Sequence, residues 1–288
     1  MIHTISDQLL LQCSEFITRR FGLHFPKKRW RDLERGLACA ARDLGFADAQ
    51  TCLRRLVATQ LTKEQTDALV GHLTIGETYF LRDKNCFEAL QEHIFPKLID
   101  SRRGREQRLR IWCAGCSTGE EPYTVAILLH RMIADLAGWN ITILATDINP
   151  ASLRKGTDGE YGEWSFRDTP SWIKEQYFTT KSDGRRVISA AIMKMVTFAP
   201  LNLARDPFPA LANNTNAMDV IFCRNVIIYF DKEAKKKVIE SFSNKLREGG
   251  YLLLGHSESL INISNAFVLR TLNNDMVYQK PLRIRAGS

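Results

Sequence analysis

The chain has 288 residues, of which 44% are hydrophobic and 25% charged, a composition typical of a folded globular protein. Its apolar runs are shorter than the roughly 18 residues that a membrane-spanning helix needs, so direct membrane insertion is not expected. Seven cysteines without framework spacing, and an N-terminal segment without a signal-like apolar stretch, favour a cytoplasmic protein with reduced thiols.

The net charge of +8 is unevenly distributed along the chain. Between Arg19 and Arg55 there are ten Lys and Arg residues against four acidic residues. Such a segment can attract an anionic partner, and it is equally typical of a solvated helix surface. Charge alone leaves both interpretations open.

Residues 1–75 carry helical periodicity and almost no strand signal. The predicted helices centre on Leu9–Ile17, Leu33–Leu44, Leu53–Val57 and Lys63–His72. Gly45 is well placed to end the second of them. These residues predict a helical N-terminal domain, and residues 76–108 are expected to form a linker and a helix.

From residue 109 onward, strand and helix patterns alternate, which predicts a doubly wound, parallel α/β domain over 109–288. The predicted strands are Leu109–Ala114, Asn140–Ala145, Met195–Ala199, Asp219–Cys223, Tyr251–Leu254 and Met276–Gln279, and the predicted helices are Glu121–Ala137 and Lys232–Leu246. A Gly-, Trp- and Tyr-rich stretch at about 158–194 interrupts this rhythm. It predicts a small inserted β hairpin or sheet.

The junction at Gly115 is the most informative local feature. A buried strand leads into a tight glycine turn and then into a helix that opens with Glu120, Glu121 and Pro122. Because glycine has no Cβ, the backbone of such a turn can lie close to a small ligand. A phosphate site would need a lysine and no acids at this position, so a neutral or cationic ligand is expected.

Polar residues follow several of the predicted strands, where ligands bind in doubly wound sheets. They are Gly115, Asp147, Asn202 and Asn225. Asp147 is suited to bind the two hydroxyls of a ribose, although a role as the N-terminal cap of a helix is an equally good interpretation. A nicotinamide cofactor is disfavoured because the turn offers only Gly115 and Gly119. The acidic turn and the acid after the second strand instead suit a ligand that carries ribose, adenine and a positive charge. This combination points to S-adenosylmethionine.

Other candidate sites have weaker support. The pair Cys113 and Cys116 has metal or redox spacing, but no second ligand pair accompanies it, so no metal site is expected. The segment Gly255–Ser259 is similar to the nucleophile turn of serine hydrolases and lacks its second glycine. Hydrolase activity is therefore not expected.

The ordered motifs of the chain resemble those of the chemotaxis-receptor glutamate methyltransferases, the CheR type. The resemblance covers about residues 10–280. It is carried by Thr74–Asp83, Gly115–Tyr123, Ala145–Asn149, Asn202–Leu203, Phe222–Phe230 and Gly255–Glu258. Each motif is moderately specific, and all of them in this order are highly specific.

The resemblance implies a Rossmann-like methyltransferase domain with a small β insertion, preceded by an all-α domain. It implies S-adenosylmethionine as methyl donor and S-adenosylhomocysteine as product. By motif position, the cofactor contacts would be Thr78, Arg82, Gly115, Glu121, Asp147, Asn202, Leu203, Arg224 and Asn225. Arg82 and Tyr229 would orient the acceptor carboxylate. The acceptors would be glutamates on the cytoplasmic helical bundle of chemotaxis receptors, which the basic N-terminal domain of a monomeric enzyme would face.

Two departures from the family pattern qualify these expectations. Many members have Asn where this chain has Gly76, which puts one polar ligand contact in doubt. The loop Thr179–Val187 is short and has one glycine, whereas members that dock on a receptor tail peptide look longer and richer in glycine there. We therefore expect this protein not to need such a tail.

Two alternative functions remain. The positive charge would also suit a nucleic-acid methyltransferase, whose binding should weaken steeply with salt. A module that binds the nucleoside without transferring a methyl group is the other alternative. Arg82 and Tyr229 argue against it, because a binding module has no use for an acceptor-orienting pair. Binding of nucleic acid is not expected.

Overall fold

The structure is a computed structural model that describes residues 5–207 and 214–282. Its N-terminal part contains α1 (Asp7–Phe21), α2 (Trp30–Asp43), α3 (Ala49–Ala58) and α4 (Lys63–Leu73). Side chains of Ser6, Asp48 and Thr62 cap the starts of α1, α3 and α4 by accepting backbone N–H groups. All four predicted helices are confirmed, and Gly45 has the positive φ of 73° expected after a helix end.

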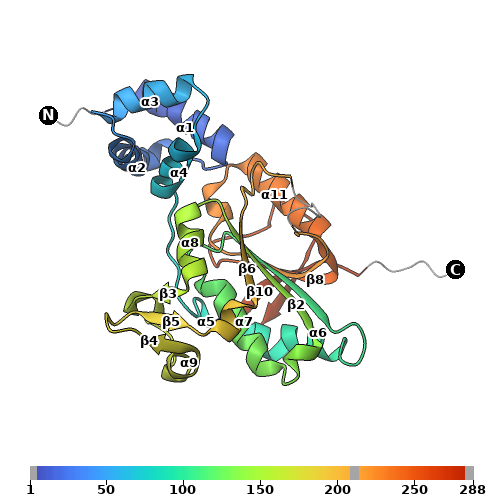
Figure 1. Cartoon of the computed structure of the whole chain (residues 1–288). Coiled ribbons are helices and arrows are strands. Elements are labelled where there is room, and N and C mark those ends of the chain that lie inside the picture. Colours follow the sequence, from blue (N-terminus) through green and yellow to red (C-terminus); the bar gives the residue numbers. More distant parts are fainter. Residues whose placement is uncertain (1–4, 208–213, 283–288) are drawn as a thin grey trace.

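The helical module, α1 to α4, has a hydrophobic core of its own. Apolar residues at helical spacing, such as Leu33 and Leu37 on α2 and Leu53 on α3, are fully buried in it. The module lies at one end of the molecule, against the α/β part (Figure 1). The three-domain division with boundaries near residues 75 and 109 stays a prediction.

The chain then passes through a connecting segment, residues 74–83, into a broken helical stretch. That stretch comprises α5 (Lys84–Ala89), a π-helical turn η2 (Leu90–Ile94) and α6 (Phe95–Asp100). Exposed turns over residues 101–107 lead to the first strand.

A seven-stranded sheet forms the centre of the α/β part. Its strands are β1 (Arg108–Ala114), β2 (Asn140–Asp147), β6 (Val196–Pro200), β7 (Met218–Cys223), β8 (Leu246–Leu254), β9 (Val268–Leu272) and β10 (Asp275–Gln279). Their order is β6-β2-β1-β7-β8-β10-β9, and the first five run parallel. The doubly wound, Rossmann-like fold expected from the sequence is confirmed.

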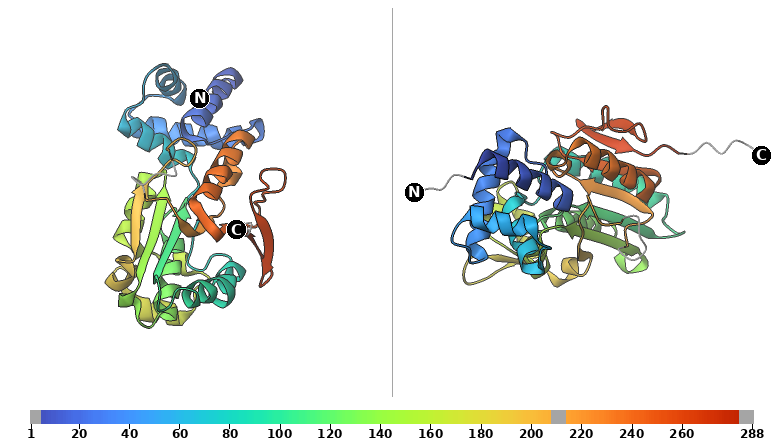
Figure 2. Two further views of the ribbon diagram at one scale, coloured as in Figure 1. Left: turned by 90° about the vertical axis from the view of Figure 1, so that its right-hand side faces the viewer. Right: turned by 90° about the horizontal axis from the view of Figure 1, so that it is seen from above.

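The end of the sheet differs from the expected parallel arrangement. Strand β10 pairs antiparallel with both β8 and β9 at the edge seen in red in Figure 2. Asn273 and Asn274, both with positive φ, form a two-residue turn between β9 and β10, and so short a turn can join only antiparallel strands. Strand β9 gave no sequence signal because it is largely exposed and lacks a buried face.

Helices cover both faces of the sheet (Figures 1 and 2). Successive residues of β1 point to opposite faces, so Ile111 joins the core beneath α7 (Glu120–Met132), whereas Trp112 packs against Phe242 of α11 (Lys232–Lys245). Helix α7 ends earlier than predicted, and a 3₁₀ turn, η3 (Leu136–Gly138), follows. Ile133 leaves the helix in an extended conformation and is buried in the core.

The insertion lies between α8 (Pro150–Asp158) and β6. It contains β3 (Glu160–Tyr161), η4 (Glu163–Phe166), α9 (Ser171–Tyr177), β4 (Phe178–Thr180), β5 (Arg186–Ile188) and α10 (Ala190–Met193). The three strands form an antiparallel sheet in the order β3-β5-β4, within the predicted range. Across the described residues, no helix combines the length and apolarity needed to span a membrane.

Candidate functional site

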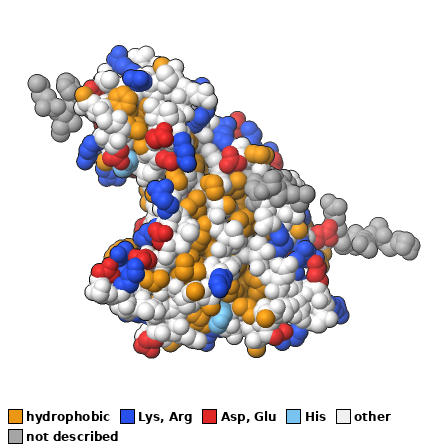
Figure 3. Space-filling view, in the orientation of Figure 1, with side chains coloured by type: hydrophobic (Ala, Val, Ile, Leu, Met, Phe, Trp, Pro, Cys, Tyr) orange, Lys and Arg blue, Asp and Glu red, His pale blue; other side chains and the backbone are white. Residues whose placement is uncertain are grey.

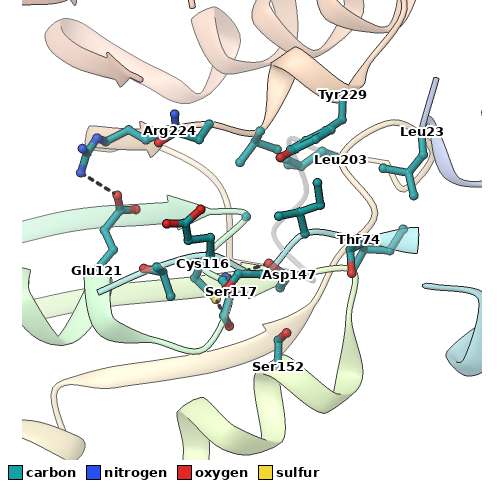
Figure 4. A pocket seen from close by; sticks show the side chains of 18 of the residues that line it. Leu23, Thr74, Cys116, Ser117, Glu121, Asp147, Ser152, Leu203, Arg224 and Tyr229 are labelled. Atoms are coloured by element: carbon teal, nitrogen blue, oxygen red, sulfur yellow. Dashed lines mark hydrogen bonds and ion pairs between the residues drawn. The ribbon is translucent and has the colours of Figure 1, made fainter. Parts of the chain in front are cut away.

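A pocket lies where the carboxyl ends of the parallel strands meet the helical module. It holds about 1050 Å³ of space free of protein atoms, counting its open mouth. Figure 4 shows Glu121 and Arg224 at one end, and Leu23 and Thr74 at the other. All ten predicted site residues line this pocket: Thr78, Arg82, Gly115, Glu121, Asp147, Asn202, Leu203, Arg224, Asn225 and Tyr229.

Gly115 forms the turn between β1 and α7. Its φ is 81°, and its N–H donates to the carbonyl of Thr146 at 2.8 Å. A Cβ on residue 115 would lie 2.4 Å from a methyl carbon of Val226, closer than real atoms approach. Glycine is therefore needed here for two reasons, the left-handed backbone and the packing of Val226 across the pocket wall.

Asp147 ends β2 and points into the pocket. Its two carboxylate oxygens accept the N–H groups of Ser117 and Asn149, each at 2.8 Å. Burial raises the pKa of this carboxyl, and the backbone N–H groups act against that rise. The start of α8 is instead capped by the side chain of Asn149, so Asp147 is not the cap and retains oxygen lone pairs for a ligand.

Glu121 and Arg224 form an ion pair at the other end of the pocket, with Nη1 and Oε2 3.2 Å apart. The guanidinium of Arg224 is also paired with Asp83 and donates to the carbonyl of Arg82 at 2.9 Å. Burial would lower the pKa of Arg224, but the nearby carboxylates raise it above its usual value. Burial raises the pKa of Glu121, and Arg224 opposes this effect. One guanidinium thus holds two carboxylates in place, which fixes the shape of this part of the pocket wall.

Glu258 holds the loop after β7, a function that sequence reasoning missed. It is 6% exposed and accepts the backbone N–H groups of Gly255, Asn225, Val226 and Ile228 at 2.7 to 3.3 Å. These bonds hold Asn225 at a φ of 58°. The motif Gly255–Glu258 was the available signal, but its spacing does not reveal which N–H groups the acid meets.

Asn202 and Leu203 follow β6 and join the two parts of the chain. The side chain of Asn202 accepts the N–H of Ala204 at 3.0 Å and donates to the carbonyl of Arg20, at the end of α1, at 3.3 Å. Leu203 is buried and supplies an apolar part of the lining. The helical module therefore shares in shaping the pocket.

Arg82 and Tyr229 line the pocket from different segments. Arg82 donates to the carbonyl of Glu77 within the connecting segment, and the ring of Tyr229 lies 5.3 Å from the guanidinium of Arg29. Burial raises the pKa of Tyr229, although the nearby Arg29 and Arg82 lower it. The phenol therefore stays protonated near neutral pH and can donate a hydrogen bond.

Gly76 lies on the pocket wall opposite the glycine turn. Its carbonyl accepts the hydroxyl of Ser117 at 3.0 Å, and a Cβ at this position would lie 3.2 Å from that hydroxyl oxygen. A side chain on residue 76 would thus reach toward Ser117 and Ser152. The polar contact that an Asn would offer is missing here.

Among the described residues, no group of three or more His, Cys, Asp or Glu is placed to hold an ion. Cys113 and Cys116 are both buried, and burial raises the pKa of each thiol well above its usual value. Both are therefore protonated and unreactive near neutral pH.

The pocket suits a nucleoside that carries a positive charge. Asp147 can accept hydrogen bonds from ribose hydroxyls, Leu203 and Ile148 provide apolar surface for a base, and the turn has no lysine for phosphate. The doubly wound sheet and this pocket define the class as that of S-adenosylmethionine-dependent methyltransferases. The model of the family described as "CheR methyltransferase, SAM binding domain" matches residues 76–275, and the chain belongs to this family.

Curated relatives extend this similarity to most of the chain. A "Chemotaxis protein methyltransferase 2" from Vibrio cholerae is 36% identical over 77% of this chain and 75% of its own length. A "Chemotaxis protein methyltransferase" from Borreliella burgdorferi is 32% identical over 89% of each chain. One of the same description from Vibrio parahaemolyticus is 30% identical over 96% of this chain and 98% of its own.

Proposed function

We propose that this protein methylates chemotaxis receptors, converting glutamate side chains into glutamyl methyl esters with S-adenosylmethionine as donor. The relatives named above support the receptor as substrate. One observation carries the chemistry: Arg82 and Tyr229, suited to a carboxylate, line the same pocket as Glu121 and Asp147, suited to the donor.

The proposed reaction asks little of the protein in acid–base terms. A glutamate side chain is ionised near neutral pH, since its reference pKa is about 4.3. When bound, S-adenosylmethionine supplies a methyl group on a positively charged sulfur, which an anionic oxygen can accept by direct displacement. This displacement requires neither a general base nor a metal.

Positioning is then the main contribution of the pocket residues. Arg82 would attract one carboxylate oxygen and the phenol of Tyr229 would donate to the same group, which fixes the direction of attack. Such orientation can be worth roughly 7–11 kcal/mol. The helical module and residues 74–79 cover the pocket from one side and limit the access of water.

We further propose that the helical module faces the receptor. Of the ten Lys and Arg residues between Arg19 and Arg55, all but Arg29 are exposed, so their charge is available to an acidic helical bundle. The protein would act as a cytoplasmic monomer, without nucleic acid.

Docking on a receptor tail peptide is not part of this proposal. The turn between β4 and β5 is closed by the N–H of Lys181 donating to the carbonyl of Arg185 at 2.8 Å. Both side chains are also paired with Glu160 on β3. This compact turn leaves no long loop for a peptide. Micromolar binding of a receptor-tail peptide at the insertion would contradict this part of the proposal.

The test is incubation with tritiated S-adenosylmethionine and receptor-containing membranes. If the protein methylates receptors, tritium should appear on the receptor, and mild alkali should release it as labelled methanol. Alkali-resistant label on nucleic acid would instead identify a nucleic-acid methyltransferase. Binding of S-adenosylhomocysteine without any transfer would identify a binding module.

Arg82→Ala tests the assignment of the acceptor side. Because Arg82 would orient the carboxylate, the variant should lose at least tenfold in kcat while its affinity for receptor membranes changes less. Sedimentation with membranes measures binding, and initial rates measure turnover. Full turnover in the variant would remove Arg82 from the mechanism.

A further inference from the structure

One large aromatic side chain of the insertion is left outside the hydrophobic core. Trp164, on η4 of the insertion, is 71% exposed. Its neighbours on the same turn are anchored: Ser165 donates to the buried carboxylate of Glu120 at 2.9 Å, and Phe166 stacks on Phe80 at 5.0 Å. The core therefore holds the turn in place and leaves the tryptophan outside.

Contacts of Arg167 connect Trp164 to the pocket wall. The guanidinium of Arg167 lies 4.3 Å from the Trp164 ring and 3.6 Å from the ring of Tyr79. It donates to the carbonyl of Trp164 at 3.0 Å and is paired with Glu77 at 3.2 Å. Tyr79 and Glu77 both line the pocket. We call Trp164, Arg167, Tyr79 and Glu77 the tryptophan rim.

The insertion that carries Trp164 borders an indentation of the molecular outline. Figure 3 shows the surface hollowed between the helical module above and the inserted sheet below, with the connecting segment at its base. Ile75 of that segment is 57% exposed and also lines the pocket. The connecting segment thus adds an exposed apolar side chain to the pocket lining.

We propose that the tryptophan rim is a docking site for the receptor helix that carries the acceptor glutamate, an inference that rests on the proposed function. For its carboxylate to enter the pocket, that helix has to lie across the mouth. Residues three or four positions from the glutamate lie on the same helix face, and an apolar one among them would pack on Trp164. Trp, Tyr and Arg are the residue types enriched at binding hot spots, and here Arg167 holds the exposed Trp164 to the half-buried Tyr79.

Charge complementarity favours an acidic helix over other occupants. The helical module, which carries nine exposed Lys and Arg residues between Arg19 and Arg55, lies on one side of the indentation, and Arg82 of the connecting segment lines the pocket. An acidic helix with one apolar residue per turn would satisfy both surfaces. The rim would then help to select which glutamate is methylated, through the residue one helical turn away.

Trp164→Ala tests this inference, with Met276→Ala as matched control. Met276 is 50% exposed on β10, near the other edge of the sheet. We expect the KM for receptor membranes to rise roughly tenfold in Trp164→Ala and to stay unchanged in the control. Both variants should keep the wild-type kcat, the wild-type affinity for S-adenosylhomocysteine and the wild-type unfolding midpoint.

The outcomes separate this inference from the proposed function. If the wild-type protein forms alkali-labile esters and Trp164→Ala has an unchanged KM, the docking inference is wrong and the proposed function stands. If the wild-type protein forms no such esters, the proposed function fails and the docking inference fails with it. An equal rise of KM in Met276→Ala would show a loss that is not specific to the rim, which also overturns the inference.

Discussion

At the scale of single residues, two carboxylates, the half-buried Asp147 and the buried Glu258, have contrasting functions. Asp147 accepts two backbone N–H groups and still faces the pocket, so it can serve the fold and a ligand together. Glu258 accepts four N–H groups and so serves the loop after β7 alone. Burial raises the pKa of both carboxyls, and the backbone hydrogen bonds that each accepts stabilise its ionised form.

Asp147→Ala should weaken the binding of S-adenosylhomocysteine by about 1–3 kcal/mol, because ribose hydroxyls would lose their acceptor. Isothermal titration calorimetry measures this directly. Asp231→Ala, which removes the cap of α11 outside the pocket, should lower stability without changing the affinity. An unchanged affinity in Asp147→Ala would count against the ribose assignment.

Glu258→Gln should lower the free energy of unfolding by about 1–3 kcal/mol, since an amide NH₂ group would face backbone donors and leave them unsatisfied. Urea titration followed by circular dichroism measures the loss. The affinity for S-adenosylhomocysteine should fall as well, because the loop carrying Asn225 lines the pocket. Wild-type stability in this variant would show that the loop holds its shape without the carboxylate.

At the scale of elements, the turn after β1 is the most constrained piece of the pocket. Gly115 needs both a positive φ and an absent side chain, because Val226 occupies the space of a Cβ. The neighbouring loop that carries Val226 is in turn held by Glu258. Two loops from separate strands thus fix each other, and a change in one is expected to move the other.

Gly115→Ala should abolish binding of S-adenosylhomocysteine and destabilise the protein by more than its backbone strain alone. Gly45→Ala is the matched control, because its φ of 73° is similar and nothing lies within 4 Å of its Cβ position. The control isolates the left-handed strain, roughly 1–2 kcal/mol. Equal losses of unfolding free energy in the two variants would show that the contact with Val226 is unimportant.

At the scale of the whole molecule, the helical module and the α/β part have separate cores and share one pocket. The first core fills the space among α1 to α4, and two more lie on opposite faces of the sheet. Buried thiols occur in all three, with Cys13 in the helical core, Cys113 beneath α7 and Cys223 on the opposite face. Their burial makes the stability of the whole molecule sensitive to alkaline pH.

Cys13→Ala tests this sensitivity. Burial raises the pKa of the Cys13 thiol to about 12, so above pH 9 the unfolded chain releases a proton that the folded chain keeps. The stabilisation is complete below pH 9 and is lost as the pH rises toward 12, at up to about 1.4 kcal/mol per pH unit. The difference in unfolding free energy between wild type and Cys13→Ala should therefore shrink from pH 8 to pH 10.5.

Leu53→Ala is the control for the thiol prediction, because it removes a buried side chain of the same core that cannot ionise. The difference in unfolding free energy between the wild type and Leu53→Ala should stay constant from pH 8 to pH 10.5. A constant difference for Cys13→Ala as well would show that the thiol does not retain its proton in the folded state.

The local patterns of the sequence determined much of this protein. Helical spacing predicts α1 to α4, apolar runs predict the buried strands, and the glycine turn with its acids predicts the kind of ligand, because each depends on residues close together in the chain. Ordered motifs brought ten residues into one predicted site, and the structure gathers all ten in one pocket.

The tertiary structure alone decided how these pieces meet. Strand β10 runs antiparallel, Asn149 rather than Asp147 caps α8, and Glu258 binds a loop about thirty residues away. The exposed position of Trp164, which Arg167 links to Tyr79, was likewise decided only by the tertiary structure. Each depends on contacts between segments far apart in the chain, which periodicity and spacing cannot specify because many chain paths share the same local pattern.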